Sequence, residues 1–304
     1  MKPFEQILCP VDFSDFSRRA LTLASRLARD FEAGLTLFHV MDMRAFSPAE
    51  AALAPKIEAA NRRRVQEQMV ELGRGVGLAP EQVEIAAGLP HKAIVQRADS
   101  GGVDLVVMGT HGLSGFERLL LGSVTEKVLH QLHLPLLAVS QKAPESILNK
   151  EGEHGLRTIL VATDFGSHAA GNLVYAAALA QRYGARLVVV HVVPSPEAYF
   201  GPLDTPWAGG IDLERVTTRL KEDSGRRLER LVTAEIRSAC APELVVESGR
   251  PSATILEIAR RRQADLIVLG AHGRGTSGLG WVGSVSHRVL RSGHCPVLAL
   301  RPRE

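Results

Sequence analysis

The spacing Gly-x2-Gly-x9-Gly-Ser occurs twice in this chain, and each copy directly follows an apolar run. The first copy begins at Gly109 and the second at Gly270. The apolar runs 104–108 and 265–269 predict strands that are buried on both faces. Each motif leads into a helix-like segment, so its glycines lie where backbone amides can bind an anion. The alternative is that these glycines serve only turns and close packing.

The two halves of the chain repeat more than this motif. A short apolar strand ends in Asp12 in the first half and in Asp164 in the second. A second strand carries His39 in the first half and His191 in the second. The two histidines are separated along the chain by the same number of residues as the two aspartates. The two glycine motifs lie further apart than that. The second half therefore contains an insertion between its second and third strands, which we place in the Pro- and Gly-rich stretch 194–210.

Strands alternate with helices in both halves, which predicts an α/β fold with doubly wound parallel sheets covered by helices on both faces. The chain has 304 residues, about twice the length of a typical domain. We therefore predict one domain over 1–141, a polar linker over 142–156, and a second domain over 157–304.

Composition narrows the class of protein. The formal net charge is only +3, with 45% hydrophobic and 23% charged residues, so the composition gives no indication of a nucleic-acid partner. No run approaches the ~20 apolar residues of a spanning helix, and the first residues lack the apolar core of a signal peptide. Cys9, Cys240 and Cys295 are far apart and are expected to be buried small hydrophobic residues in a reducing cytoplasm.

The carboxyl ends of the strands suggest a mononucleotide site. If the first and fourth strands are central neighbours, Asp12 meets Gly109 and Asp164 meets Gly270 at the crevice where such sheets bind ligands. A carboxylate can accept hydrogen bonds from a ribose hydroxyl or an adenine amino group, and a glycine-rich helix N-terminus can bind phosphates. The alternative for both aspartates is a cap or turn after a strand. Neither a Walker A loop nor Gly-x-Gly-x-x-Gly is present.

Two serines complete the motif. Ser123 and Ser284 can each donate a hydroxyl hydrogen bond to a ligand or cap the helix that follows. His39 and His191 are expected to be core histidines with satisfied hydrogen bonds. No set of residues at metal-ligand spacing stands out, and none is assigned a catalytic role.

The doubled glycine motif, the early strand ending in Asp and the His-Val strand resemble the universal stress protein family, in particular its tandem two-domain members. The resemblance covers nearly the whole chain. It implies a five-stranded sheet in the order 3-2-1-4-5 in each domain, related to the Rossmann and adenine nucleotide alpha-hydrolase folds. It also implies that ATP or another adenine nucleotide binds at the motif, with Mg²⁺ recruited by the phosphates. Dimers formed partly through the fifth strand imply an intramolecular pseudo-dimer, with a homodimer of two chains as a further possibility.

The resemblance implies nucleotide contacts for matching positions in the two halves. In the first half these are Pro10, Val11, Asp12, Val40, Met108, Gly109, Gly112, Gly122, Ser123 and Val124. In the second half they are Ala162, Thr163, Asp164, Val192, Leu269, Gly270, Gly273, Gly283, Ser284 and Val285. Arg274 adds a cation to the second motif, so we expect the second site to bind a triphosphate more tightly than the first.

The function that follows is a cytoplasmic stress-response or signalling module. Its output would be a nucleotide-dependent conformation or the binding of a protein partner that the sequence does not identify. One alternative is a slow ATPase or a phosphoryl or nucleotidyl transferase. Another is an oligomeric scaffold that binds no nucleotide. A membrane or nucleic-acid partner is not expected.

Overall fold

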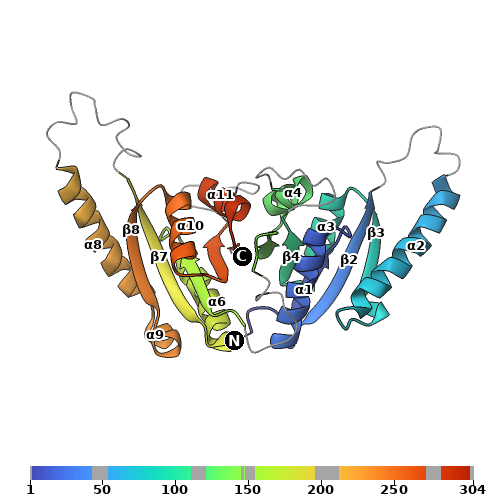
Figure 1. Cartoon of the computed structure of the whole chain (residues 1–304), viewed down its shortest axis with the longest axis horizontal. Helices are drawn as coiled ribbons and strands as arrows, with labels where there is room; N and C mark the ends of the chain where they lie inside the picture. The colour runs from blue at the N-terminus through green and yellow to red at the C-terminus, as the bar shows by residue number, and fades with distance from the viewer. Residues whose placement is uncertain are drawn as a thin grey trace, which may run out of the picture. The chain divides into compact units, whose positions relative to one another are not determined.

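The structure is a computed structural model that describes residues 2–42, 54–110, 121–144, 147, 155–195, 212–271 and 282–301. Contacts between Cα atoms divide the chain into two compact units, Lys2–Gly152 and Glu153–Pro302, which we call the first and the second unit. Figure 1 shows the strands of each unit with helices packed along them. Within the described residues, no helix is both long enough and apolar enough to cross a membrane.

The first unit alternates strands and helices. Its described elements are β1 (Gln6–Pro10), α1 (Asp15–Asp30), β2 (Gly34–Asp42), α2 (Ala54–Arg74), the 3-10 helix η2 (Pro80–Gln82), β3 (Val83–Gly88), α3 (Pro90–Asp99), β4 (Leu105–Gly109), α4 (Ser123–Gln131) and β5 (Leu136–Val139). The strands pair in parallel in the order β3-β2-β1-β4-β5. In the register, Pro10 lies opposite Phe38, and Leu8 lies opposite Val106.

The second unit repeats this order with one addition. Its described elements are β6 (Thr158–Ala162), α6 (Ala169–Tyr183), β7 (Arg186–Pro194), α8 (Leu213–Leu231), α9 (Ala234–Cys240), β8 (Glu243–Gly249), α10 (Pro251–Arg261), β9 (Leu266–Gly270), α11 (Ser284–Ser292) and β10 (Val297–Leu300). The strands pair in parallel in the order β8-β7-β6-β9-β10. The predicted fold class and the order 3-2-1-4-5 are therefore confirmed in both units.

Helix α9 is a difference between the units that the sequence did not indicate. The first unit has the single turn η2 at the corresponding place, between its second helix and its third strand. Thr233 caps α9 by accepting a hydrogen bond from the backbone N–H of Ile236, at 3.4 Å. Most of the stretch 194–210, where we expected the inserted residues, lies outside the described residues.

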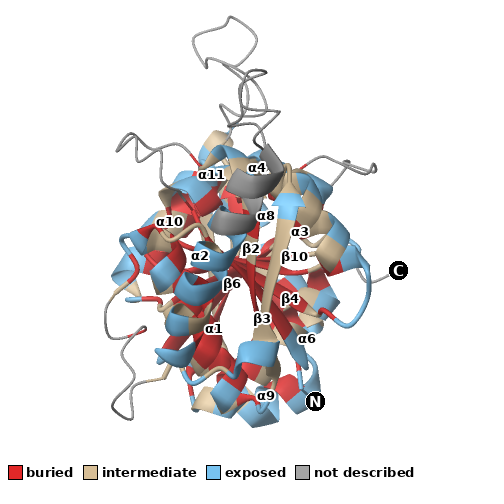
Figure 2. Cartoon of the chain, turned by 90° about the vertical axis from the view of Figure 1, so that its right-hand side faces the viewer, coloured by how far each residue is buried: buried red, intermediate tan, exposed pale blue. Residues whose placement is uncertain are grey.

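Apolar periodicity explains how the helices pack on the sheets. Helix α1 buries one face, which includes Ala20, Leu21, Ala24 and Leu27, and it contacts β1 and β4. The strands β4 and β6 are buried along their whole length, as Figure 2 shows by its red core. These strands read as continuous apolar runs because helices cover parallel sheets on both faces.

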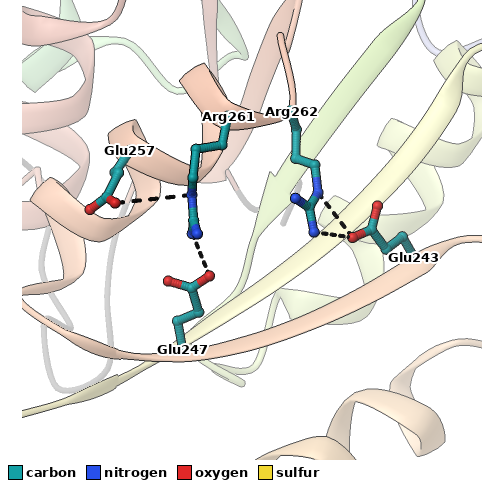
Figure 3. Close-up of polar contacts among 5 residues, drawn as sticks. All are labelled: Glu243, Glu247, Glu257, Arg261 and Arg262. Atoms are coloured by element: carbon teal, nitrogen blue, oxygen red, sulfur yellow. Dashed lines mark hydrogen bonds and ion pairs between the residues drawn. The ribbon is translucent and has the colours of Figure 1, made fainter.

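Ion pairs hold α10 against the edge strand β8. The guanidinium of Arg262, the C-cap of α10, donates two hydrogen bonds to Glu243 of β8, at 2.5 and 3.0 Å. Its neighbour Arg261 pairs with Glu247 of β8 and, at 4.0 Å, with Glu257 one turn earlier in α10 (Figure 3). Charged side chains on one face of an edge strand also disfavour pairing with another chain.

The start of the predicted linker is held against α1. Arg19 donates a hydrogen bond to the carbonyl oxygen of Ala143, and Arg26 donates to that of Ile147 at 3.3 Å. Both linker residues are buried. This part of the linker is therefore packed on the first unit.

The cysteines follow the sequence expectation in part. Cys9 and Cys295 are buried and are free thiols, and burial raises the pKa of Cys295 to about 12 and that of Cys9 higher still. Cys240 is only half-buried, so the expectation of burial is wrong for this residue. It lies at the end of α9, where its Sγ lies 3.6 Å from the carbonyl oxygen of Ala177.

Candidate functional site

The first unit brings Asp12 and Gly109 to the same edge of its sheet. Strands β1 and β4 are neighbours, and Asp12 follows β1 by two residues whereas Gly109 is the last residue of β4. The backbone N–H of Val11 donates to Phe38 of β2 at 2.8 Å, which extends the pairing of β1 and β2 as far as the aspartate. The sequence predicted that these residues meet if the first and fourth strands are neighbours. Strands β1 and β4 are neighbours, so the residues do meet at this edge.

The carboxylate of Asp12 is part of a turn stabilised by serines. Its Oδ1 accepts from the backbone N–H of Ser14 at 3.1 Å and from the Ser14 hydroxyl at 2.5 Å. Ser14 is also the N-cap of α1, because its side chain accepts from the N–H of Ser17 at 3.2 Å. The Ser17 hydroxyl in turn accepts from the N–H of Asp12 at 3.3 Å. One carboxylate oxygen thus serves the turn, as the structural alternative predicted.

Asp164 occupies the matching position after β6, in a turn that lacks the capping serine. Its Oδ1 accepts from the N–H of Gly166 at 2.8 Å, and Thr163 Oγ1 accepts from the N–H of Phe165 at 3.1 Å. Glycine replaces the capping serine here, and the N-cap of α6, His168, makes no side-chain capping bond. As a result Asp164 is exposed, whereas Asp12 is half-buried.

Hydrogen bonds close the base of the glycine loop in the first unit. The N–H of Gly122 donates to the carbonyl oxygen of Thr110 at 2.6 Å. The hydroxyl of Thr125 donates to the carbonyl oxygen of Gly109 at 2.8 Å. The end of β4 and the start of α4 are therefore joined, although the loop 111–120 between them lies outside the described residues.

The second unit uses the same two bonds. The N–H of Gly283 donates to Ala271 at 2.8 Å, and the hydroxyl of Ser286 donates to the carbonyl oxygen of Gly270 at 2.6 Å. Thr125 and Ser286 were not singled out from the sequence. Both occur two residues after the Ser of the motif, so the repeated hydroxyl was the available signal.

The helices α4 and α11 present their N-termini at the end of the glycine loops. Gly122 and Gly283 are the N-cap residues and make no side-chain capping bond. Ser123 and Ser284 are the first helical residues and are exposed, so of their two alternatives the capping role does not hold and the hydroxyl-donor role remains a prediction. The first amides of a helix have no partner within it, and the helix dipole makes this end positive.

Gly109 has a packing role that the structure makes explicit. A Cβ atom at this position would lie 2.9 Å from the backbone carbon and oxygen of Phe16 in α1. Only glycine allows the end of β4 and the start of α1 to approach this closely. The packing alternative therefore accounts for Gly109 by itself.

The predicted apolar contacts lie in or beside the central strands. In the first unit Val11, Val40 and Met108 are buried, and in the second Ala162, Val192 and Leu269 are buried. They lie in or directly after these strands and not on an open surface. The predicted site residues Gly112, Gly273 and Arg274 lie outside the described residues.

A histidine and a phenylalanine flank each aspartate, and the sequence did not assign either to the site. His39 Nδ1 lies 2.7 Å from the carbonyl oxygen of Val11, and its ring centroid lies 4.8 Å from that of Phe13. Phe13 has a φ of 66°, and Phe165 in the second unit has a φ of 59°. A bulky residue in this left-handed region costs about 1–2 kcal/mol, so surrounding contacts must hold it there.

Burial lowers the pKa of His39, while the contact with Val11 and the charge of Asp12 act in the opposite direction. The net effect favours a neutral ring at neutral pH. Because a carbonyl oxygen only accepts, Nδ1 carries the proton in this tautomer. In the described part of the chain, no group of three or more His, Cys, Asp or Glu residues could hold a metal ion.

Comparisons with known proteins fit this doubled architecture. The model of the Universal stress protein family matches residues 3–140 and again 155–301. The chain belongs to the universal stress protein family. A full-length relative, a universal stress protein of Mycolicibacterium smegmatis, is 32% identical over 317 residues, which cover 98% of this chain and 97% of the relative.

Other members resemble a single half or share the fold of the whole. Universal stress protein MJ0531 of Methanocaldococcus jannaschii is 34% identical over 149 residues, which cover 47% of this chain and 85% of that protein. The crystal structure of a universal stress protein from Archaeoglobus fulgidus has a TM-score of 0.66 and 22% identity, and covers 97% of this chain and 98% of its own. The tandem arrangement of this universal stress protein is thus found in other members at full length.

Proposed function

We propose that this universal stress protein binds ATP or another adenine nucleotide at the carboxyl end of each sheet. One observation carries the proposal: in each unit, an aspartate and a helix N-terminus without a side-chain cap follow two neighbouring central strands. The aspartate would accept hydrogen bonds from the adenosine part, and the amides of the glycine loop and helix would bind the phosphates. The site residues predicted from the sequence, Arg274 among them, are the proposed contacts.

Mg²⁺ would enter with the phosphates. The donor set at these strand ends is one carboxylate and several amides, which suits a nucleotide and does not form a metal cage. A triphosphate brings its own oxygen ligands for Mg²⁺, so the protein need supply few.

We further propose that the output is a nucleotide-dependent conformation or the binding of a protein partner in the cytoplasm. Each glycine loop is fixed at its base, by Gly122 on Thr110 and by Gly283 on Ala271, so a bound phosphate would order the loop between fixed ends. The division into domains 1–141 and 157–304 with a linker at 142–156, the pseudo-dimer and the homodimer remain parts of this proposal.

Isothermal titration of nucleotide-free protein with ATP and Mg²⁺ tests the binding proposal. We expect saturable heat at micromolar ATP, and mass spectrometry of the denatured, freshly purified protein should release an adenine nucleotide. No heat at high micromolar ATP, together with no co-purified nucleotide, would favour the scaffold alternative.

A turnover assay separates binding from catalysis. We expect fewer than about one ATP hydrolysed per minute, because the sequence indicates no placed general base and no transition-state cation other than Arg274. Multiple turnovers per minute that disappear in Arg274→Ala would favour the ATPase or transferase alternative.

A further inference from the structure

We propose that His39 and His191 are positioning residues for the two nucleotide sites, each fixing the backbone on both sides of the site aspartate. The inference rests on the proposed function and adds residues that are not among the proposed ligand contacts. The pair is the same in both units: a histidine from the second strand and a phenylalanine directly after the aspartate.

The first half of this arrangement is a hydrogen bond to the residue before the aspartate. His39 Nδ1–H donates to Val11 at 2.7 Å, and His191 Nδ1–H donates to Thr163 at 2.8 Å. Each carbonyl has left the strand pairing at this point, because β1 ends at Pro10 and β6 ends at Ala162. The histidine thus satisfies the first backbone acceptor beyond each strand.

The second half is a ring contact with the residue after the aspartate. The rings of Phe165 and His191 have centroids 4.3 Å apart, and those of Phe13 and His39 lie 4.8 Å apart. Both phenylalanines adopt positive φ angles, which a bulky residue rarely does unless its surroundings hold it. The backbone turns sharply at this residue, and the contact with the histidine ring retains the turn.

One histidine therefore contacts the residues at i−1 and i+1 of each aspartate. A histidine that only filled the core could satisfy its ring nitrogen on any nearby acceptor. Here the same contacts recur in two units whose turns differ otherwise, since Ser14 is replaced by Gly166 and Val11 by Thr163. The contacts on both sides of the aspartate are retained, and we take this as a sign that they position the aspartate for binding.

The second unit adds a cation to this arrangement. Asp12 also accepts bonds from Ser14, whereas the bond that Asp164 accepts from the N–H of Gly166 involves no side chain. Arg227 of α8 lies over the ring of Phe165, the residue after this aspartate, with its Cζ 4.2 Å from the ring centroid.

The test separates the donor of the histidine from its ring. In an Asp12→Ala background, which leaves the second site to report, His191→Asn keeps a donor near the Nδ1 position and His191→Phe keeps a ring without a donor. We expect His191→Phe to weaken ATP binding about tenfold, as an orphaned acceptor predicts, and His191→Asn to weaken it by less than about threefold. Titration calorimetry measures affinity, and thermal unfolding without ATP shows that the two variants are folded.

Each outcome of these titrations supports or overturns the positioning role. If ATP binds the wild type and the Asp12→Ala background, and His191→Phe binds it equally well, the positioning role is wrong while the proposed function stands. Equal losses in His191→Asn and His191→Phe also overturn the donor role. Absence of ATP binding by the wild type contradicts the proposed function and this inference with it.

A second variant covers the case in which His191→Phe does not fold. Phe165→Asn removes the ring but tolerates the left-handed backbone, and it leaves the histidine donor in place. We expect it to weaken ATP binding about threefold in the same background. Unchanged affinity would overturn the contribution of the ring contact.

Discussion

The two units place the same aspartate in different surroundings. Asp12 is half-buried and accepts bonds from both the backbone and the hydroxyl of Ser14, the N-cap of α1. Asp164 is exposed and accepts from the backbone N–H of Gly166, and its neighbour Phe165 lies under Arg227. The first carboxylate accepts hydrogen bonds from a capping serine, whereas the residue after the second carboxylate packs against a guanidinium.

The N-termini of α4 and α11 also differ in charge. The first turn of α4 contains Glu126, whereas the first turn of α11 contains no acidic residue and has His287 at the matching position. An acidic group at a helix N-terminus competes with a bound anion for the positive end of the dipole. If nucleotide binds as proposed, we expect the first site to place the adenosine part more precisely and the second to bind phosphate more tightly. Arg274 predicts the same order of triphosphate affinity from the sequence.

The largest effect is expected at Gly109. Its Cβ would lie 2.9 Å from the Phe16 backbone, so Gly109→Ala should move α1 away from β4 and lower the free energy of unfolding by about 2 kcal/mol. Urea denaturation measures this, and Gly171→Ala is the control, because its Cβ meets nothing within 4 Å and alanine favours a helix. A Gly109→Ala variant as stable as the wild type would show that the close approach is not required. The same measurement on Gly270→Ala shows whether the second unit has the same constraint.

The next effect concerns the aspartates. Asp12→Ala and Asp164→Ala should each weaken ATP binding at their own site by about tenfold to a hundredfold, because each removes a charged acceptor. Titration calorimetry of the single and double variants assigns the two sites. The comparison fails if either single variant abolishes binding at both sites, or if the double variant binds ATP as the wild type does.

Ser14 should have an intermediate effect that is confined to the first unit. Ser14→Ala removes the N-cap of α1 and a donor to Asp12, so we expect a loss of about 1 kcal/mol in stability and about threefold weaker ATP binding at the first site. Ser167→Ala is the matched control, because Ser167 is an exposed serine in the corresponding turn of the second unit. Equal losses in the two variants would remove the distinction between the turns.

The smallest effect is expected from the helix charges. Glu126→Gln should tighten ATP binding at the first site about twofold, and His287→Glu should weaken it at the second by a similar factor. Titration with adenosine, which has no phosphate, is the control and should show no change. If adenosine affinity shifts as much as ATP affinity, the helix N-termini are not the phosphate sites.

The sequence predicted the sheets well because buried parallel strands and glycine motifs are local patterns. It also placed Asp12 beside Gly109, since strand neighbours determine which ends meet. It did not predict the contacts between elements: His39 with Val11, or the left-handed Phe13. Those depend on distances across the sheet, which neither periodicity nor spacing contains.

The capping alternative for the motif serines fails for a related reason. The serines of the motif looked like N-caps by residue type, but the helices α4 and α11 begin at Ser123 and Ser284 themselves, after glycine caps. The glycine at that place forms the bond that closes the loop, Gly122 on Thr110 in the first unit. Residue type alone could not indicate which of two adjacent residues takes the capping position.

The most direct test of nucleotide binding at the strand ends is a crystal structure with saturating ATP and Mg²⁺. The account predicts nucleotide density in the second unit between Asp164 and the N-terminus of α11, with the phosphates toward Ser284. Density for ATP elsewhere on the chain, or strand ends filled by the protein's own side chains in both units, would contradict it.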